Sequence, residues 1–212
     1  MVTKEQAEQI KDYVKQLESH SKIELVPILS ARSGNYHEAS YKIIILSLVA
    51  FILTSTYFIL FPSWDGEINH SAIMMSLAII FFIGTMINFI APLKKIFISS
   101  AAIEEACSTH LNENFIQHEV FNTIDRTGIL LQISYYEHDI RLLADSGINK
   151  VVDNEIWNEL IKDISKSYKE HRNPVKGFKT VIEKLEQISK KHGLDKDHTD
   201  TNELDDKLII KE

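Results

Sequence analysis

Two long apolar runs stand out along the chain. No charged side chain occurs from Ile43 to Trp64 or from Ser71 to Leu93. Each run exceeds the roughly 20 residues that an α-helix needs to cross a hydrocarbon core about 30 Å thick. Neither run carries the polar stripe of a helix that packs in a soluble core. Because only residues 65–70 separate them, the pattern predicts an antiparallel transmembrane hairpin, with the lipid bilayer as a partner.

Positive charges flank the two runs on one side only. Lys42 precedes the first run, and Lys94 and Lys95 follow the second, whereas the connecting loop holds the acidic Asp65 and Glu67 and no Lys or Arg. Lys and Arg concentrate on the cytoplasmic side of membrane proteins. The sequence therefore predicts a multi-pass protein of the cytoplasmic (inner) membrane with both termini in the cytoplasm.

The segment before the first run has the pattern of one helix and one strand. Residues 3–19 repeat apolar side chains at helical spacing, and Thr3 with Gln6 has the spacing of a capping box. Residues 23–29 are apolar and partly β-branched, which predicts a strand. Pro27 has no N–H to donate, so we expect it at an edge or irregular position of a sheet.

The segment after the second run begins with one helix and a pair of strands. Residues 99–121 predict a helix with an imperfect apolar stripe, and Thr127 and Gly128 mark a stop. Residues 129–134 and 139–145 predict strands. The four residues between these strands favour an antiparallel hairpin.

Two amphipathic helices and a charged tail complete the chain. The apolar periodicity predicts helices over residues 154–169 and 175–191, and Trp157 is expected in the core. In the tail after His192, Leu204 and the Leu208–Ile210 segment hold the apolar side chains that can dock.

These elements predict a single α/β domain that the membrane hairpin interrupts. The N-terminal helix and strand (residues 1–41) are too small to bury a core alone, so we expect them to pack on residues 96–192. The hairpin occupies residues 42–95, and residues 193–212 form the tail. A helix separates the first strand from the second, so these two should run parallel in a small mixed sheet flanked by helices, and the third should be antiparallel.

Composition excludes some classes of function. The net charge of -7 argues against nucleic acid as a partner, because binding nucleic acid rewards a basic face. Cys107 is the only cysteine, which excludes an intrachain disulfide and a cysteine-rich metal site.

Several short motifs in the soluble segments resemble those of the TPM domain. They cover most of the chain in the family's order, and the likeness is greatest to bacterial membrane members with a transmembrane hairpin. In chain order they are Ala31-Arg32-Ser33 with Tyr36, Asp125-Arg126-Thr127-Gly128, Ile129-Leu130-Leu131, Ile133-Ser134, Glu137, Ala144-Asp145-Ser146-Gly147-Ile148, Trp157 and Asn202-Glu203-Leu204-Asp205-Asp206.

The resemblance implies a TPM-like α/β sandwich. The chain departs from the family pattern at Ser21-Lys22, where a Thr-Gly-like pair is usual, and at Asp205, where Pro is common. Relatives include a thylakoid lumen protein linked to photosystem II repair and a nematode receptor-associated protein. Phosphatase activity and calcium binding are claimed for some members, whereas the membrane subgroup has no settled function.

Two carboxylates are the candidate site residues. Asp125 precedes one strand of the predicted hairpin and Asp145 ends the other, so both should fall at one edge. With Thr127 and the carbonyls around Gly147 they can form an oxygen-rich cage, which suits Ca²⁺ or Mg²⁺. The alternative is structural, because Asp commonly caps turns and Arg126 can pair with either carboxylate.

Two functions remain open at this point. The first is a non-catalytic, membrane-anchored module at the cytoplasmic face that binds a protein partner or a divalent ion. The second is a metal-dependent phosphatase, which needs several convergent ligands and an activated water or nucleophile. No catalytic residue is predicted, since Ser33 and Ser134 lack a nucleophile motif, and the first function is favoured.

Overall fold

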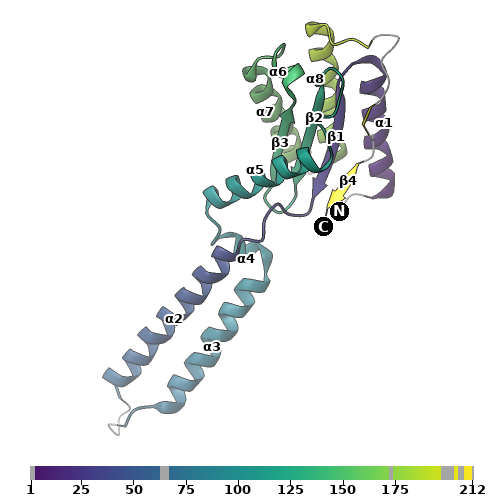
Figure 1. Ribbon diagram of the computed structural model, residues 1–212. Coiled ribbons are helices and arrows are strands. Elements are labelled where there is room, and N and C mark those ends of the chain that lie inside the picture. Colours follow the sequence, from purple (N-terminus) through teal and green to yellow (C-terminus); the bar gives the residue numbers. More distant parts are fainter. Residues whose placement is uncertain (1–2, 63–66, 172–173, 197–202, 205–207, 212) are drawn as a thin grey trace. The chain divides into compact units, whose positions relative to one another are not determined.

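The chain forms two compact units in the computed structural model, which describes residues 3–62, 67–171, 174–196, 203–204 and 208–211 (Figure 1). Met1–Gly34 and Glu105–Glu212 form an α/β unit, and Asn35–Glu104 form a helical unit. The N-terminal segment thus joins the C-terminal segment in one fold, as predicted. The helical unit begins and ends several residues outside the predicted hairpin, residues 42–95.

A mixed sheet forms the centre of the α/β unit. Its strands are β1 (Glu24–Ser30), β2 (Gly128–Ser134), β3 (Asp139–Ala144) and β4 (Ile209–Lys211), and their order is β3-β2-β1-β4. β1 is parallel to β2 and β4, while β3 is antiparallel to β2. The parallel and antiparallel pairings of the first three strands confirm the predictions.

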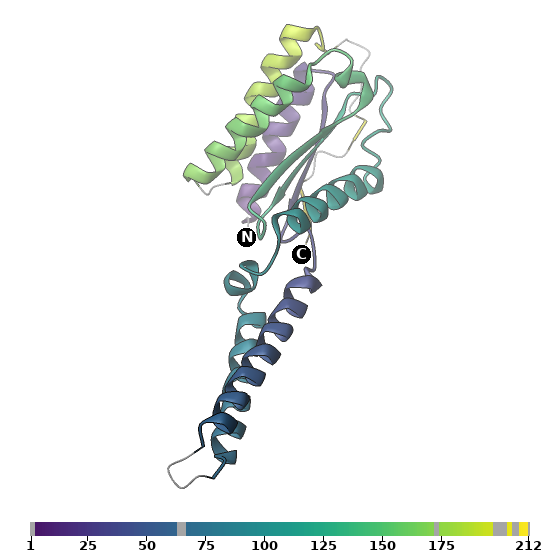
Figure 2. The same cartoon turned by 90° about the vertical axis from the view of Figure 1, so that its left-hand side faces the viewer.

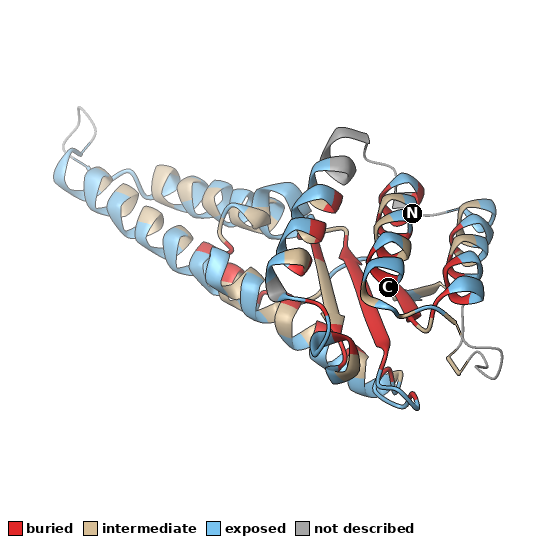
Figure 3. Ribbon diagram, turned by 90° about the horizontal axis from the view of Figure 1, so that it is seen from above, coloured by how far each residue is buried: buried red, intermediate tan, exposed pale blue. Residues whose placement is uncertain are grey.

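Helices cover both faces of the sheet (Figure 2). α1 (Lys4–His20), α7 (Asn154–His171) and α8 (Pro174–His192) lie on one face, and α5 (Ser100–Gln117) lies on the other. The short α6 (Ser146–Asn149) follows β3. Every residue of β1 and β2 is buried, as expected for strands that are covered on both faces (Figure 3).

The larger core lies between the sheet and the three helices α1, α7 and α8. The predicted stripe on α1 and the predicted Trp157 belong to it. The capping box of α1 is present, with Gln6 N donating to Thr3 Oγ1 (3.2 Å) and Thr3 N donating to Gln6 Oε1 (3.0 Å). A smaller apolar cluster lies under α5 and includes Leu111.

Pro27 was expected at an edge, but β1 is an interior strand. The ladder with β4 begins only at Ile28, just beyond the proline. On the same side of β1, Leu25 N donates to the buried carboxylate of Glu18 (3.0 Å). The strand therefore tolerates Pro27 because β4 is short and a side chain replaces the missing strand partner.

The apolar residues of the charged tail were expected to be able to dock, and residues 209–211 do so as the strand β4. Ile28, Leu29 and Ser30 pair with the three residues of this strand. Leu204 and Ile209 pack on the cluster under α5. A three-residue strand has too little periodicity to be recognised in a charged tail, and it forms because β1 offers an unpaired edge.

The helix α5 ends four residues before its predicted end at residue 121. Glu119 adopts a left-handed conformation (φ 49°), and Val120 N donates to the carbonyl of Phe115 (3.1 Å). This is the pattern of a Schellman cap, which usually has glycine in the left-handed position. Since glutamate occupies that position here, the sequence carries no obvious stop signal.

The helical unit contains α2 (His37–Leu60), α3 (His70–Phe89) and the short α4 (Ala91–Lys95). α2 and α3 are long and apolar enough to span a membrane, and almost none of their residues are fully buried within the protein. This agrees with the predicted hairpin. Trp64 at the end of the first apolar run, Asp65 and Gly66 of the predicted loop, and Asn202, Asp205 and Asp206 of the tail motif lie outside the described residues.

Candidate functional site

The two predicted carboxylates belong to one corner of the α/β unit, where the loop before β2 meets the end of β3. Gly147 N donates to the carbonyl of Arg126 (2.9 Å), and Asp145 N donates to that of Gly128 (2.9 Å). A Cβ placed on Gly147 would lie only 2.1 Å from the carbonyl oxygen of Asp125. The backbone segments that carry the two aspartates are therefore in direct contact.

Asp145 is a buried cap with a paired charge. Its side chain is 5% exposed, and Oδ1 accepts a hydrogen bond from Ser146 N (2.6 Å), which caps α6. Arg126 approaches the same carboxylate with Nη2 3.0 Å from Oδ1 and Nε 2.6 Å from Oδ2. This arrangement is the turn cap and ion pair that the sequence left open as an alternative.

Asp125 lies at the same corner but on the surface. Its side chain is 58% exposed and lies 3.5 Å from Lys22 Nζ. A surface pair of this kind contributes about 0–1 kcal/mol to stability. Different basic side chains thus pair with the two carboxylates, Lys22 with Asp125 and Arg126 with Asp145. The backbone of Gly147 packs against the carbonyl groups of residues 125 and 126, in the space where the predicted metal ion would lie.

A metal site at this corner stays a prediction. Among the described residues, no group of three or more His, Cys, Asp and Glu side chains lies close enough together to hold a metal ion. Thr127, the third predicted ligand, is buried, and its carbonyl accepts a hydrogen bond from Glu24 N (3.3 Å). A divalent cation would have to displace Lys22 and Arg126 to reach both carboxylates.

The corner loop, residues 119–127, presents apolar side chains to solvent. Ile124 is 86% exposed and Phe121 is 36% exposed. The guanidinium of Arg126 lies 5.9 Å from the centre of the Phe121 ring. The exposed loop was not predicted, although Phe121 and Ile124 in a largely polar segment were a usable signal.

Hydrogen bonds hold the corner loop in one conformation. Ile124 N donates to Glu203 Oε2 (2.9 Å), and Thr127 N donates to Thr123 Oγ1 (3.0 Å). Arg126 has a left-handed backbone (φ 56°), which costs of order 1–3 kcal/mol and persists where surrounding contacts enforce it. These contacts stabilise the loop conformation in which Ile124 is exposed.

A second polar cluster lies beneath α5, at the carboxyl ends of the parallel strands. A row of polar side chains crosses all four strands in register: Lys211, Ser30, Ser134 and Asp139. Ligands of open α/β sheets commonly bind at such strand ends. Gln132 lies two residues before Ser134 on β2. It is the sequence signal for this polar cluster, because it interrupts an otherwise apolar strand.

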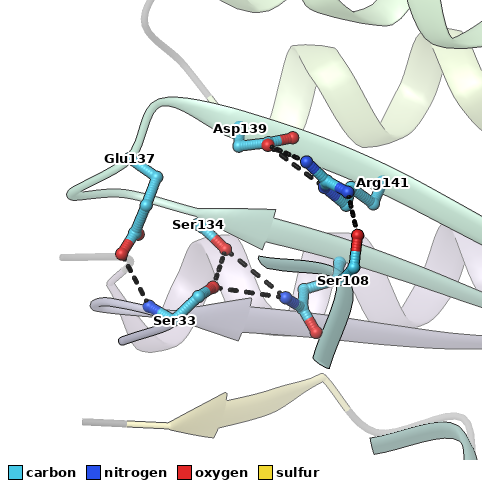
Figure 4. A network of polar contacts seen from close by, with 7 residues as sticks. Ser33, Ser108, Ser134, Glu137, Asp139 and Arg141 are labelled. Carbon is cyan, nitrogen blue, oxygen red and sulfur yellow. Dashed lines mark hydrogen bonds and ion pairs between the residues drawn. The ribbon is translucent and has the colours of Figure 1, made fainter. Parts of the chain in front are cut away.

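The groups of this cluster bond to one another and to α5 (Figure 4). Ser33 Oγ lies 2.6 Å from Ser134 Oγ, and Glu137 Oε1 accepts a hydrogen bond from Ser33 N (2.9 Å). Arg141 bridges Asp139 on its own strand and Ser108 on α5, with distances of 2.8 and 2.6 Å.

Further bonds attach α5 to the sheet. Asn114 Nδ2 donates to Gln132 Oε1 (2.8 Å), and Lys211 Nζ donates to Asn114 Oδ1 (2.6 Å) and Gln117 Oε1 (2.7 Å). These bonds connect α5 to β2 and β4, which indicates that the cluster seats the helix, although the buried Ser30 Oγ has no hydrogen-bond partner among the described residues.

The local environments disfavour nucleophilic chemistry in this cluster. Burial, together with the charge of Asp139, raises the pKa of the Cys107 thiol to about 11, whereas the thiolate is the reactive form. The hydroxyl groups of Ser33 and Ser134 face each other. Burial lowers the pKa of His110 and His118 on the same side of the sheet, and the Lys211 ammonium lowers both further.

The comparisons with known proteins bear on the fold. No family model and no curated protein match the chain. The NMR structure of the BA42 protein from the psychrophilic bacterium Bizionia argentinensis is similar, with a TM-score of 0.60 and 15% sequence identity, and the match covers 99% of this chain and 95% of that chain. At this identity the likeness shows the fold alone. The chain shares its mixed α/β fold with BA42, and the TPM resemblance stays a prediction.

Proposed function

We propose that the chain is a membrane-tethered, non-catalytic module whose α/β unit binds a protein partner through the corner loop. The observation that carries the proposal is the 86% exposure of Ile124 in a loop held by hydrogen bonds. Burying such a side chain in an interface removes apolar surface worth about 1.5–3 kcal/mol from water. A loop that is already ordered loses little further entropy on binding.

The composition of the corner loop also supports binding to a protein. Phe121 and Ile124 supply apolar contact area, and Arg126 is 51% exposed beside them. Aromatic and arginine side chains are enriched among the residues that dominate protein–protein affinity. Asp125, next to Ile124, adds a charge at the rim that favours one orientation of the partner.

The side-chain environments support the non-catalytic part of the proposal. The carboxylate of Asp145 is occupied by Arg126 and Ser146 N, and the thiol of Cys107 has a raised pKa. These arrangements stabilise the fold and leave the groups without the activation that acid–base or nucleophilic catalysis requires.

We also propose that the hairpin lies in the cytoplasmic (inner) membrane with both termini in the cytoplasm, as the flanking lysines favour. The α/β unit would then meet a cytoplasmic partner. Membership of the TPM family belongs to the same proposal. It is supported by the contact between two of the resembling motifs, Asp125-Arg126-Thr127-Gly128 and Ala144-Asp145-Ser146-Gly147-Ile148, at one corner.

Site-specific photo-crosslinking of the full-length protein in cells tests the docking surface. A photoreactive amino acid at Ile124 should give a discrete protein adduct, whereas the same amino acid at Lys15, an exposed position on α1, should not. Asp125→Lys should weaken the adduct, because it reverses the rim charge and costs the fold no more than a loose surface pair.

Two results would contradict the proposal. The first is an equal yield of adducts at positions 124 and 15, which would remove the corner loop as a specific surface. The second is phosphomonoester hydrolysis by the purified protein that depends on Ca²⁺ or Mg²⁺ and disappears in Asp145→Asn. That result would establish the metal-dependent phosphatase in place of the non-catalytic module.

A further inference from the structure

The membrane hairpin has a groove along one side of the seam between α2 and α3. Its volume is about 500 Å³, and both helices line it. Most of the lining is apolar, but Ser40, Ser47, Thr85 and Asn88 place polar groups in it. A groove that faces lipid and contains polar side chains is an unusual surface, because such groups in membrane helices commonly face other helices.

The two helices approach each other closely on the floor of this groove. A Cβ placed on Gly84 would lie 2.6 Å from Ser47 Oγ. The Ser47 hydroxyl donates to the carbonyl of Ile43 (2.9 Å), and that of Thr85 donates to the carbonyl of Phe81 (2.8 Å). Both hydroxyl donors are therefore satisfied within their own helices.

Asn88 differs from the other polar residues of the groove. Its Oδ1 accepts a hydrogen bond from Ser40 Oγ (2.8 Å) across the two helices. Its side chain is exposed, and within the described part of the chain its amide N–H groups donate no hydrogen bond. Acyl chains offer no acceptor, so insertion of the hairpin in a bilayer leaves these donors to another protein group or to the membrane surface.

We propose that the groove is an interface between two copies of this chain, with Asn88 of each copy bonded to Asn88 of the other. A carboxamide carries both donors and an acceptor, so it is complementary to itself across a two-fold axis. The same symmetry lays the groove of one hairpin against the groove of the other.

The second copy is favoured over a single helix of another protein because it brings the same polar groups to the interface. Both walls belong to one hairpin, and a second hairpin offers two matching walls with the same polar groups in register. The proposal is independent of the corner loop, which lies in the α/β unit. It rests on α2 and α3 spanning a bilayer, as their length and composition allow.

The test is the association of full-length protein in lipid vesicles. Protein labelled at its N-terminus with a donor or acceptor fluorophore is reconstituted in vesicles of phosphatidylcholine and phosphatidylglycerol and diluted with lipid while energy transfer is measured. The wild type should dimerise. Asn88→Leu should raise the dissociation constant roughly tenfold, as expected for loss of an interhelical hydrogen bond, and Asn88→Gln should restore part of the association.

Thr56→Leu is the matched control, since it also replaces a polar membrane residue with leucine. Thr56 is exposed, lies outside the groove and donates to the carbonyl of Ile52 within α2 (2.8 Å). This variant should dimerise like the wild type. A monomeric wild type would overturn the proposal and leave the groove to another membrane helix or to lipid. An unchanged Asn88→Leu variant, or an equal loss in Thr56→Leu, would also overturn it.

Discussion

Removal of the Arg126 side-chain charge should destabilise the α/β unit more than removal of the charge of Asp145, its ion-pair partner. In Arg126→Met, the carboxylate of Asp145 stays buried and keeps only Ser146 N as a hydrogen-bond donor. Loss of one partner from a fully buried ion pair costs about 3–5 kcal/mol, and loss of an exposed pair costs about 1 kcal/mol at most. Because Arg126 is half-exposed and Asp145 is buried, we expect a cost of about 2–3 kcal/mol.

Asp145→Asn should cost less, about 1 kcal/mol. Asparagine retains an oxygen that accepts from Ser146 N, and it is as good a helix cap as aspartate. The arginine left behind is half-exposed and can be hydrated. The double variant should be no less stable than Arg126→Met alone, since it no longer buries an unpaired charge.

Thermal unfolding of the full-length protein in detergent measures these differences. In a Trp64→Phe background, Trp157 is the sole tryptophan, and its burial in the main core makes its fluorescence a reporter of the α/β unit. The midpoint should fall by about 4–12 °C in Arg126→Met and by at most about 4 °C in Asp145→Asn. Equal losses in the two single variants, or losses that simply add in the double variant, would refute the reasoning.

Four further predictions use related measurements. Impermeant reagents should label a cysteine in the loop between the two spans in intact cells but not one at either terminus, and the reverse would contradict the predicted topology. If a divalent cation binds at the corner in place of Lys22 and Arg126, millimolar Ca²⁺ or Mg²⁺ should raise the unfolding midpoint of the wild type but not of Asp145→Asn, because both carboxylates come together only in the folded state; no shift in the wild type would leave the two aspartates in their structural roles. The pKa values of His110 and His118 lie below 6.5 in the folded protein, so the stability they contribute is present above that pH and lost as the pH falls through the folded values. The midpoint should therefore drop less between pH 7.5 and 5 in a His110→Gln/His118→Gln variant than in the wild type. Gly128→Ala should unfold at a much lower temperature, because its Cβ would lie 1.9 Å from the carbonyl oxygen of Val120, and an unchanged midpoint would show that the backbone there can move.

The sequence determined the elements that depend on near neighbours. The stripe of Ile10, Val14 and Leu17 specifies α1, because residues three and four apart share a helix face whatever the rest of the chain does. The capping box and the antiparallel hairpin of β2 and β3 are equally local. The two spans follow from length and apolarity alone.

Pairings between distant segments needed the tertiary structure. Nothing near Pro27 indicates that Glu18 satisfies the backbone beside it, or that a tail segment about 180 residues away joins β1 as β4. The end of α5 was also hidden, since Glu119 replaces the glycine that usually marks a Schellman cap. These features arise because unpaired backbone groups take the nearest partner in space, which is not the nearest in sequence.

The corner shows the same division. The antiparallel hairpin predicted that the segments carrying Asp125 and Asp145 meet, and their backbones are in contact. The sequence could not assign Arg126 to Asp145 and Lys22 to Asp125, because long side chains choose among several carboxylates according to burial and geometry. The sequence also did not predict that Ile124 would be exposed. Whether an apolar residue joins a core or faces solvent is decided by what packs against it, and the folded loop leaves Ile124 in the open.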